Sequence, residues 1–178
     1  MDFLTAEVWT PKGLETQHVL LAIELKTRCV ELAGITPHPT ESFMAQVARS
    51  LMDSLDGFLR DHVALICDRD SKFTERFRDT LRQAGVEVVV TPYLTPNCNA
   101  YAERFVLSLR SECLDRLILF GRHKLRRALQ EYIEHYNSER PHQGIGNVPI
   151  SGRSIPRRGP VTCQERLGGL LKHYRVAA

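Results

Sequence analysis

The first third of the chain alternates apolar runs with turn residues, a pattern typical of β-strands. Residues 1–9 predict a strand that includes the first residues of the sequence. Residues 10–13 (Thr-Pro-Lys-Gly) are residue types that favour a turn. The near-continuous apolar run of residues 18–25 predicts a strand covered on both faces, and residues 29–35 predict a third strand. Because the connections are short, the pattern favours an antiparallel meander.

From Thr40 onward, the apolar residues follow a helical period. Two short apolar runs, residues 63–67 and 86–90, have the length of buried strands. Amphipathic helices are predicted over about residues 41–59, from Phe73 to the terminating Gly85, from Asn99 onward, and over about residues 124–138. This order of elements predicts an α/β domain in which helices flank a five-stranded mixed sheet.

The composition changes after Arg140, where glycine, proline and arginine become frequent. We therefore interpret residues 1–148 as one domain and residues 149–178 as a basic Gly/Pro-rich tail, extended or loosely packed. Residues 164–174 have the length for one short C-terminal helix. Met1 stands directly before Asp2, so the first strand is expected to be truncated at its N-terminal end and the geometry of Asp2 to be affected.

Composition limits the classes of function only weakly. The 43% hydrophobic and 25% charged residues are typical of a soluble globular protein, and a net charge of +3 permits a nucleic-acid partner without requiring one. Five cysteines without a Cys-x-x-Cys pair argue against a disulfide framework or a zinc knuckle and favour a reducing cytoplasm. No apolar run reaches the roughly 20 residues that span a bilayer, and no signal-peptide pattern opens the chain, so we expect a cytoplasmic protein.

Three acidic residues stand at comparable places near the ends of predicted elements. Asp2 lies on the first strand, Asp68 follows the fourth strand, and Glu103 lies in the first turn of the helix that Asn99 is expected to cap. Hard divalent cations prefer oxygen ligands, and two ions about 4 Å apart hold a phosphodiester from both sides. The three acids therefore form a candidate metal site, although a first-turn glutamate is also favoured by the helix dipole alone.

Two motifs resemble those of bacterial insertion-sequence transposases and the related retroviral integrases. The first is Asp68, separated by 34 residues from Glu103, with Asn99-Ala100 leading into the latter. The second is the stretch from Tyr136 to His142 (Tyr-Asn-Ser-Glu-Arg-Pro-His), which is similar to the family's Tyr-Asn-x-x-Arg-Pro-His element. The resemblance implies a ribonuclease-H-like fold, Mg²⁺ or Mn²⁺ as cofactor, and DNA end cleavage and strand transfer. It also implies that Asp2, Asp68 and Glu103 are the catalytic, metal-binding acids.

The family pattern leaves two questions open. Asp70 occupies a position where the family usually has glycine, so it rivals Asp68 as the second ligand; we prefer Asp68, because Asp70 is able to cap the helix that carries Phe73. Family members also carry a helix-turn-helix region before the core, which residues 1–178 lack. Two alternative functions remain: a ribonuclease-H-like nuclease, and an inactive remnant that only binds DNA or self-associates.

Basic residues near these motifs are candidates for DNA contact. Arg104 and Arg110 follow Glu103 on its helix, Lys124 belongs to a basic cluster, and Arg140 and His142 follow a helix end. Such residues also occur on ordinary solvated faces and at helix C-termini, where cations favour the dipole. The resemblance implies that the partners are the element's DNA ends, target DNA and further copies of the chain, near the bacterial nucleoid.

Overall fold

A three-stranded antiparallel sheet lies at the centre of the computed structural model, which describes residues 1–93, 99–151 and 159–176. Its strands are β1 (Asp2–Thr10), β2 (Gly13–Ile23) and β3 (Val30–Thr36), in the order β1-β2-β3. The turn between β1 and β2 is tight, and Gly13 has a φ of 111°, which favours glycine. The predicted meander is therefore confirmed.

Two further strands form a separate parallel sheet. β4 (Ala64–Cys67) pairs with β5 (Glu87–Val90), so the prediction of one continuous five-stranded sheet is wrong. Among the described residues, a hydrogen bond connects the two sheets along this edge, from the N-terminal nitrogen of Met1 to the carbonyl oxygen of Ile66 at 2.8 Å. Strand β1 pairs with β2, and β4 pairs with β5, so the two sheets have separate hydrogen-bond ladders.

The first helix is shorter than predicted. Helix α1 spans Glu41–Leu51, with Thr40 as its N-cap, so the predicted extension to residue 59 is wrong. The chain turns instead, with the amide of Gly57 donating to the carbonyl of Asp53 at 3.0 Å. A side chain at position 57 would approach the Asp53 backbone to 2.4 Å, so this turn requires glycine. Leu55, on the predicted apolar face, is 86% exposed.

Helix α2 (Glu75–Gln83) ends before Gly85, as predicted. Gly85 has a φ of 87°, a conformation that glycine adopts easily. The cap is Thr74, so the prediction that Asp70 caps this helix is wrong. Asp70 instead accepts a hydrogen bond from the backbone amide of Lys72 and stabilises the preceding turn.

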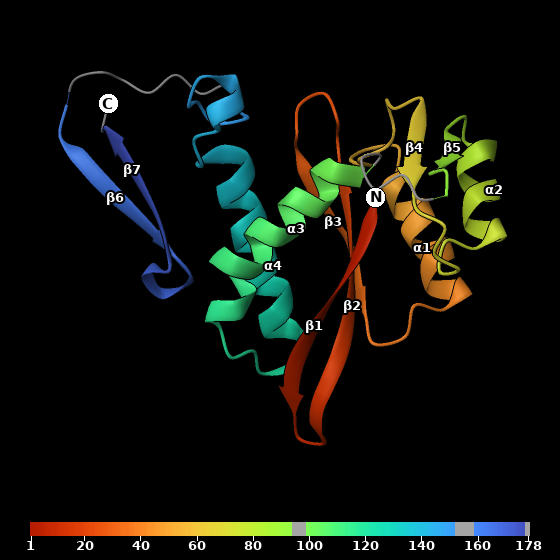
Figure 1. Cartoon of the computed structure of the whole chain (residues 1–178), viewed down its shortest axis with the longest axis horizontal. Coiled ribbons are helices and arrows are strands. Elements are labelled where there is room, and N and C mark those ends of the chain that lie inside the picture. Colours follow the sequence, from red (N-terminus) through yellow and green to blue (C-terminus); the bar gives the residue numbers. More distant parts are fainter. Residues whose placement is uncertain (94–98, 152–158, 177–178) are drawn as a thin grey trace.

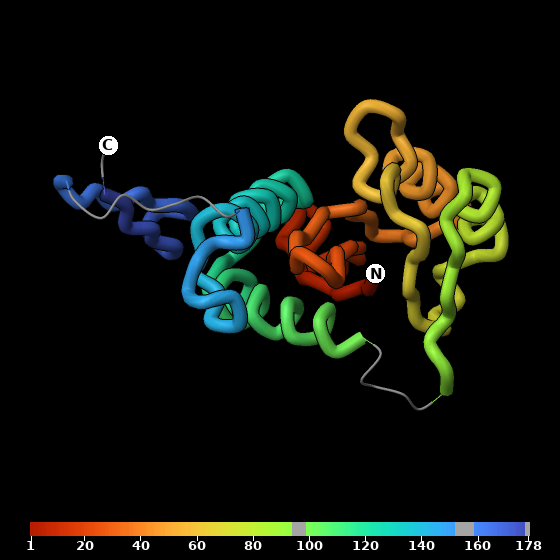
Figure 2. Tube along the Cα trace, turned by 90° about the horizontal axis from the view of Figure 1, so that it is seen from above, coloured from red at the N-terminus to blue at the C-terminus, as the bar shows by residue number. Residues whose placement is uncertain are grey.

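The helices cover both faces of the central sheet. Helices α3 (Ala100–Glu112) and α4 (Gly121–Ser138) lie on one side of β1–β3, while α1, α2 and the β4–β5 sheet lie on the other (Figures 1 and 2). Two apolar cores result, one between the central sheet and α3 and α4, the other between the sheet and α1, α2 and β4. No helix within the described residues is long and apolar enough to cross a membrane.

The C-terminal region forms a hairpin of β6 (Val161–Arg166) and β7 (Leu171–Val176) beside α4 (Figure 1). The predicted short helix over residues 164–174 is therefore wrong. Two successive glycines at the tip, Gly168 and Gly169, have φ values of 67° and 90°, which no right-handed helix contains. The hairpin is attached to α4 by the Arg166 guanidinium, which contacts the Glu139 carboxylate at 2.6 Å.

Candidate active site

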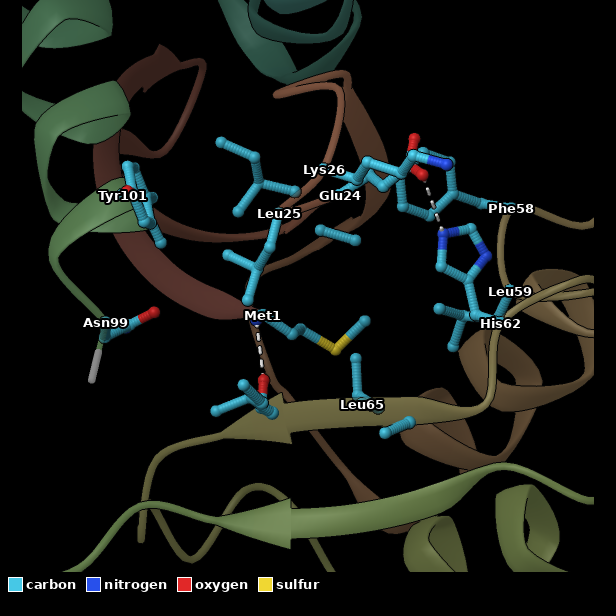
Figure 3. Close-up of a pocket in the computed structure, with 15 residues that line it drawn as sticks. Met1, Glu24, Leu25, Lys26, Phe58, Leu59, His62, Leu65, Asn99 and Tyr101 are labelled. Carbon is cyan, nitrogen blue, oxygen red and sulfur yellow. Dashed lines mark hydrogen bonds and ion pairs between the residues drawn. The ribbon is translucent and has the colours of Figure 1, made fainter.

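Asp2 lies near Asp68, which follows the end of β4, and the charge of Asp68 acts on Asp2. The hydrogen bond from Met1 to Ile66 (Figure 3) fixes the start of β1 beside β4, and each acid lies within two residues of it along its own strand. The first turn of α3, which carries Glu103, lies beside the N-terminus (Figure 1). Residues that are 101 positions apart in the sequence, Asp2 and Glu103, thus belong to one region of the molecule.

The three acids interact electrostatically. Burial raises the pKa of Asp2 above its ordinary value of 3.8, and the negative charges of Asp68 and Glu103 raise it further. The backbone amide of Phe3, which donates to Asp2 Oδ1 at 2.8 Å, and the positively charged N-terminus oppose this shift. Because like charges repel, a cation bound among these carboxylates would relieve a cost that the metal-free chain carries.

The surroundings of Asp68 and Asp70 differ in one respect that bears on ligand choice. Asp70 forms an ion pair with the Lys72 ammonium. Burial alone would raise the pKa of Asp70, but the side-chain and backbone hydrogen bonds from Lys72 lower it overall. Asp68 Oδ1 accepts only a backbone hydrogen bond among the described contacts, from the amide of Asp70 at 3.1 Å. The charge of Asp70 is thus already compensated, which favours Asp68 as the free ligand.

The donor chemistry of this region suits a hard divalent cation, but the acids are not packed into a closed cluster. Among the described residues, no three His, Cys, Asp or Glu side chains are close enough to form a preformed metal site. Asp2 and Asp68 each have one oxygen held by a backbone amide, whereas Glu103 is exposed. The three carboxylates are thus oxygen donors of the kind that such a cation prefers, contributed by separate elements.

The start of α3 differs from the sequence expectation. Asn99 occupies the N-cap position but makes no side-chain capping hydrogen bond, so the predicted cap is wrong at this residue. Residues 94–98, which precede this helix and include the further capping candidate Asn97, lie outside the described residues. The dipole of the helix N-terminus still favours an acidic side chain in its first turn, where Glu103 lies.

Three of the candidate DNA-binding residues have structural partners within the chain. Arg110 donates to the backbone carbonyl of Thr5 at 3.0 Å and so attaches α3 to β1. Arg140 forms an ion pair with Glu112 at 2.7 Å, and His142 contacts the carbonyl of Tyr136 at 2.9 Å. Arg104 and Lys124, by contrast, are exposed. DNA contact by any of these residues stays a prediction.

The Tyr136–His142 motif connects α4 to the rest of the core. The side chain of Asn137 accepts a hydrogen bond from the Val30 amide at 3.0 Å and donates to the Val30 carbonyl at 2.9 Å, so it continues the edge of β3. The ring of Tyr136 lies edge-on to Phe105 with centroids 4.8 Å apart. The motif therefore holds the helix that carries Glu103 against the sheet.

Arg28 is a basic residue near this region that the sequence patterns did not single out. Its guanidinium lies 3.4 Å from the centre of the ring of Tyr101, which is the second residue of α3. Burial raises the pKa of Tyr136, and the positive charges of Arg140, Arg28 and Arg104 oppose that shift. These three arginines thus lie near Tyr136. No periodicity could have revealed Arg28, since it lies in a turn with a φ of 71°.

Comparison with known proteins gives consistent results. Residues 84–149 match the model of the integrase core domain family. A protein of Xanthomonas euvesicatoria, described as an insertion element IS476 uncharacterized 39.2 kDa protein, is 32% identical over 87 residues, which are 48% of this chain and 25% of that protein. The chain thus spans about a quarter of the length of this relative.

Solved integrase structures share the fold. A chain of the simian T-cell lymphotropic virus intasome in complex with the PP2A regulatory subunit B56 gamma matches with a TM-score of 0.60 and 13% identity, over 98% of this chain and 65% of that chain. The catalytic core domain of BIV integrase matches with a TM-score of 0.51 and 16% identity, over 84% and 90% of the two chains. Residues 84–149 are thus similar to the integrase core domain family, and the fold is similar to that of the catalytic core of BIV integrase.

Proposed function

We propose that this chain is the catalytic core of an insertion-sequence DNA transposase, a polynucleotidyl transferase that cleaves the element's ends and joins them to target DNA. The main support is the electrostatic effect of Asp68 and Glu103 on Asp2, since these three acids come from separate elements. The Met1–Ile66 hydrogen bond brings Asp2 next to the end of β4, and the charges of Asp68 and Glu103 both act on Asp2. The match to the integrase core domain family supports the same class of chemistry.

In this proposal Asp2, Asp68 and Glu103 would hold Mg²⁺ or Mn²⁺, and the ion would supply Lewis-acid stabilisation of the charge on the reacting oxygens. Asp2 and Asp68 would contribute fixed geometry, because a backbone amide orients one oxygen of each. The exposed Glu103 is free to adjust its position when DNA binds. The chain's own contribution is thus to gather and orient oxygen donors at one edge of the fold.

The DNA would lie along the side of α3 that carries positive charge. Arg104 is exposed beside Glu103, and Arg28 stacks on Tyr101 one turn away, so both are placed to meet phosphates. Lys124, exposed at the start of α4, would add affinity independent of sequence. Arg110, Arg140 and His142 would contribute mainly by positioning α3 and α4 through their internal contacts.

A strand-transfer assay separates the proposed function from its two alternatives. The chain is mixed with Mn²⁺ or Mg²⁺, a supercoiled plasmid and a short duplex that ends in a free 3′-hydroxyl, and joined products are resolved on a gel. Joined product supports the transposase. Nicking without joining identifies a nuclease of the same fold. Neither product, together with the absence of saturable metal binding by calorimetry in the presence of DNA, identifies a remnant without chemistry.

Neutralising Asp2 should stabilise the metal-free chain at neutral pH. The pKa of Asp2 is raised in the folded chain, so its carboxylate costs stability as pH rises through that pKa, and the cost disappears below the ordinary value of 3.8. Asp2→Asn keeps an oxygen for the Phe3 amide and is expected to raise the melting temperature in EDTA at pH 7, with a smaller gain at pH 4. Thermal denaturation at the two pH values measures both. An equal gain in melting temperature at pH 7 and pH 4 would show that the stabilisation does not come from removing the charge of Asp2.

Self-association is part of the proposal, because an apolar surface lies at the far end of the central sheet. Trp9, Leu14 and Phe120 are 51%, 56% and 66% exposed. They are neighbours, since Trp9 pairs with Leu14 across β1 and β2 and forms a bridge to Phe120. Contiguous exposed apolar side chains of this kind mark interaction surfaces.

We expect the double substitution Trp9→Lys with Phe120→Lys to weaken self-association at least about tenfold, because it places charge on a surface that desolvates on contact. Sedimentation velocity across a concentration series measures the change. Leu55→Lys is the matched control, since Leu55 is 86% exposed on the loop after α1. If Leu55→Lys weakened self-association equally, the surface formed by Trp9, Leu14 and Phe120 would not be the site of self-association.

A further inference from the structure

Basic side chains cluster at the start of helix α4. One of them, Arg127, pairs with Glu131 at 2.7 Å. The others are exposed and, within the described ranges, take part in no ion pair: Arg122, His123, Lys124 and Arg126. We call these four residues the basic face. The charges of its two arginines and its lysine are therefore not compensated within the part of the chain that the structure describes.

The basic face opposes the stability of the helix that carries it. The N-terminal end of a helix is the positive end of its dipole, so cations there are unfavourable. Arg122 and Arg126 are four residues apart and lie next to each other on the helix surface, where like charges repel. No acidic residue lies in the first turn, and Phe120 at the N-cap position makes no side-chain hydrogen bond. Because local stability does not account for this arrangement, a role in binding is favoured.

The basic face lies at the opposite end of the central sheet from the candidate metal site. Phe120, directly before α4, forms a bridge with Trp9 near the end of β1, and the Trp9 amide donates to the carbonyl of Leu119 at 2.8 Å. Asp2 begins the same strand, which runs from the N-terminus toward the start of α4 (Figure 1). At roughly 3.3 Å per residue, the strand rises about 23 Å from Asp2 to Trp9.

This separation decides which part of a DNA molecule the basic face is able to reach. Electrostatic screening in salt has a length of about 8 Å at physiological ionic strength, so these charges act little on a phosphate held by the acids. B-form DNA carries a phosphate on each strand every 3.4 Å or so along its axis, and a distance of about 23 Å corresponds to about seven base pairs. A partner of the basic face is therefore bound away from the reacting phosphate.

We propose that the basic face is a second DNA contact, which binds the phosphate backbone of a duplex about seven base pairs from the position of the acids. The choice of DNA as the polyanion rests on the proposed function, whereas the uncompensated charge does not depend on it. Each guanidinium binds phosphate oxygens through parallel N–H donors. Arg122 and Arg126 are separated by about 6 Å along the helix axis, so they are able to hold neighbouring phosphates of one strand. Such contacts position the duplex and read no sequence.

Removing the two arginines tests the proposal. Arg122→Ala with Arg126→Ala is compared with Arg49→Ala with Arg76→Ala, which removes the same charge from exposed positions of α1 and α2. Fluorescence anisotropy of a labelled duplex of about 24 base pairs, in EDTA, gives the dissociation constant. At about 0.1 M salt the first variant is expected to raise it at least about tenfold, and to reduce the slope of log K against log salt by about 1.8. The control should change it less than about twofold.

Two further measurements separate lost contacts from lost structure. Arg122→Lys with Arg126→Lys keeps both charges, so its salt slope should equal that of wild type. The double alanine variant should melt about 2 °C above wild type, because it removes two cations from the positive end of the helix dipole. Weaker DNA binding by a more stable chain does not come from unfolding.

Three results would overturn the proposal. An unchanged dissociation constant for the double alanine variant at positions 122 and 126 would mean that the basic face does not touch DNA. An equal loss in the control would mean that net charge alone decides binding. A loss of affinity for phosphatidylserine vesicles, with DNA binding unchanged, would make the partner a lipid surface. Binding in EDTA involves no strand transfer, so a failure here is distinguishable from a failure of the proposed function.

Discussion

Replacing Glu103 by glutamine is expected to lower the rate of strand transfer about a thousandfold, while the chain keeps its fold. The substitution preserves the size of the side chain but removes the charge that the metal requires, a loss on the order of 4 kcal/mol of transition-state stabilisation. Because Glu103 is exposed, no packing is lost. Single-turnover strand transfer with Mg²⁺ measures the rate, and circular dichroism measures the melting temperature of the same preparation.

Asp68→Asn and Asp70→Asn form the matched pair of controls. Asp68→Asn is expected to match the Glu103→Gln loss, whereas Asp70→Asn should keep strand transfer within about threefold, since Lys72 already compensates the Asp70 charge. The opposite result would make Asp70 the second metal ligand. A large fall in the melting temperature of Glu103→Gln would instead assign a structural role to that carboxylate.

Asn137→Ala is expected to destabilise the chain by about 2–3 kcal/mol, which lowers the melting temperature by roughly 5–10 °C. The substitution removes two hydrogen bonds to the backbone of Val30 and leaves that amide and carbonyl unpaired next to a side chain that is 1% exposed. Chemical denaturation with urea gives the free energy of unfolding. Strand transfer at a temperature well below the transition should change much less than stability does.

Two controls sharpen this test. Asn137→Asp keeps the acceptor for the Val30 amide but loses the donor, so its stability should lie between those of wild type and alanine. Gln130→Ala, at an exposed position of the same helix, should change stability by less than about 0.5 kcal/mol. If Asn137→Ala had the same free energy of unfolding as wild type, the hydrogen bonds of Asn137 would not stabilise the fold, and a role in contacts with other molecules would be favoured.

The sequence predicted the local elements well wherever the apolar period was clean. The meander, the short strands β4 and β5, and the helix that ends at Gly85 all follow from spacing and turn chemistry. Two errors occurred where a turn that contains glycine interrupts the apolar pattern. Helix α1 stops early because Gly57 folds back on Asp53, and the expected C-terminal helix is a hairpin because Gly168 and Gly169 reverse the chain.

For the candidate site too, the sequence predicted some features and the packing determined others. The spacing of Asp68 and Glu103, and the resemblance it carries, indicated an acidic site before any geometry was considered. Three pairings depend on packing: the Asp70–Lys72 ion pair, the stacking of Arg28 on Tyr101, and the Glu112–Arg140 ion pair. None of these pairings is encoded in a period or a spacing.

The sequence by itself determined the order and type of most elements, because helical and strand periods depend on neighbouring residues. Only the tertiary structure decided that β1–β3 and β4–β5 form separate sheets, with the hydrogen bond from Met1 to Ile66 between them, and that the charges of Asp68 and Glu103 act on Asp2. Such contacts join residues far apart along the chain, and they follow from how the helices and sheets fill space around their shared cores.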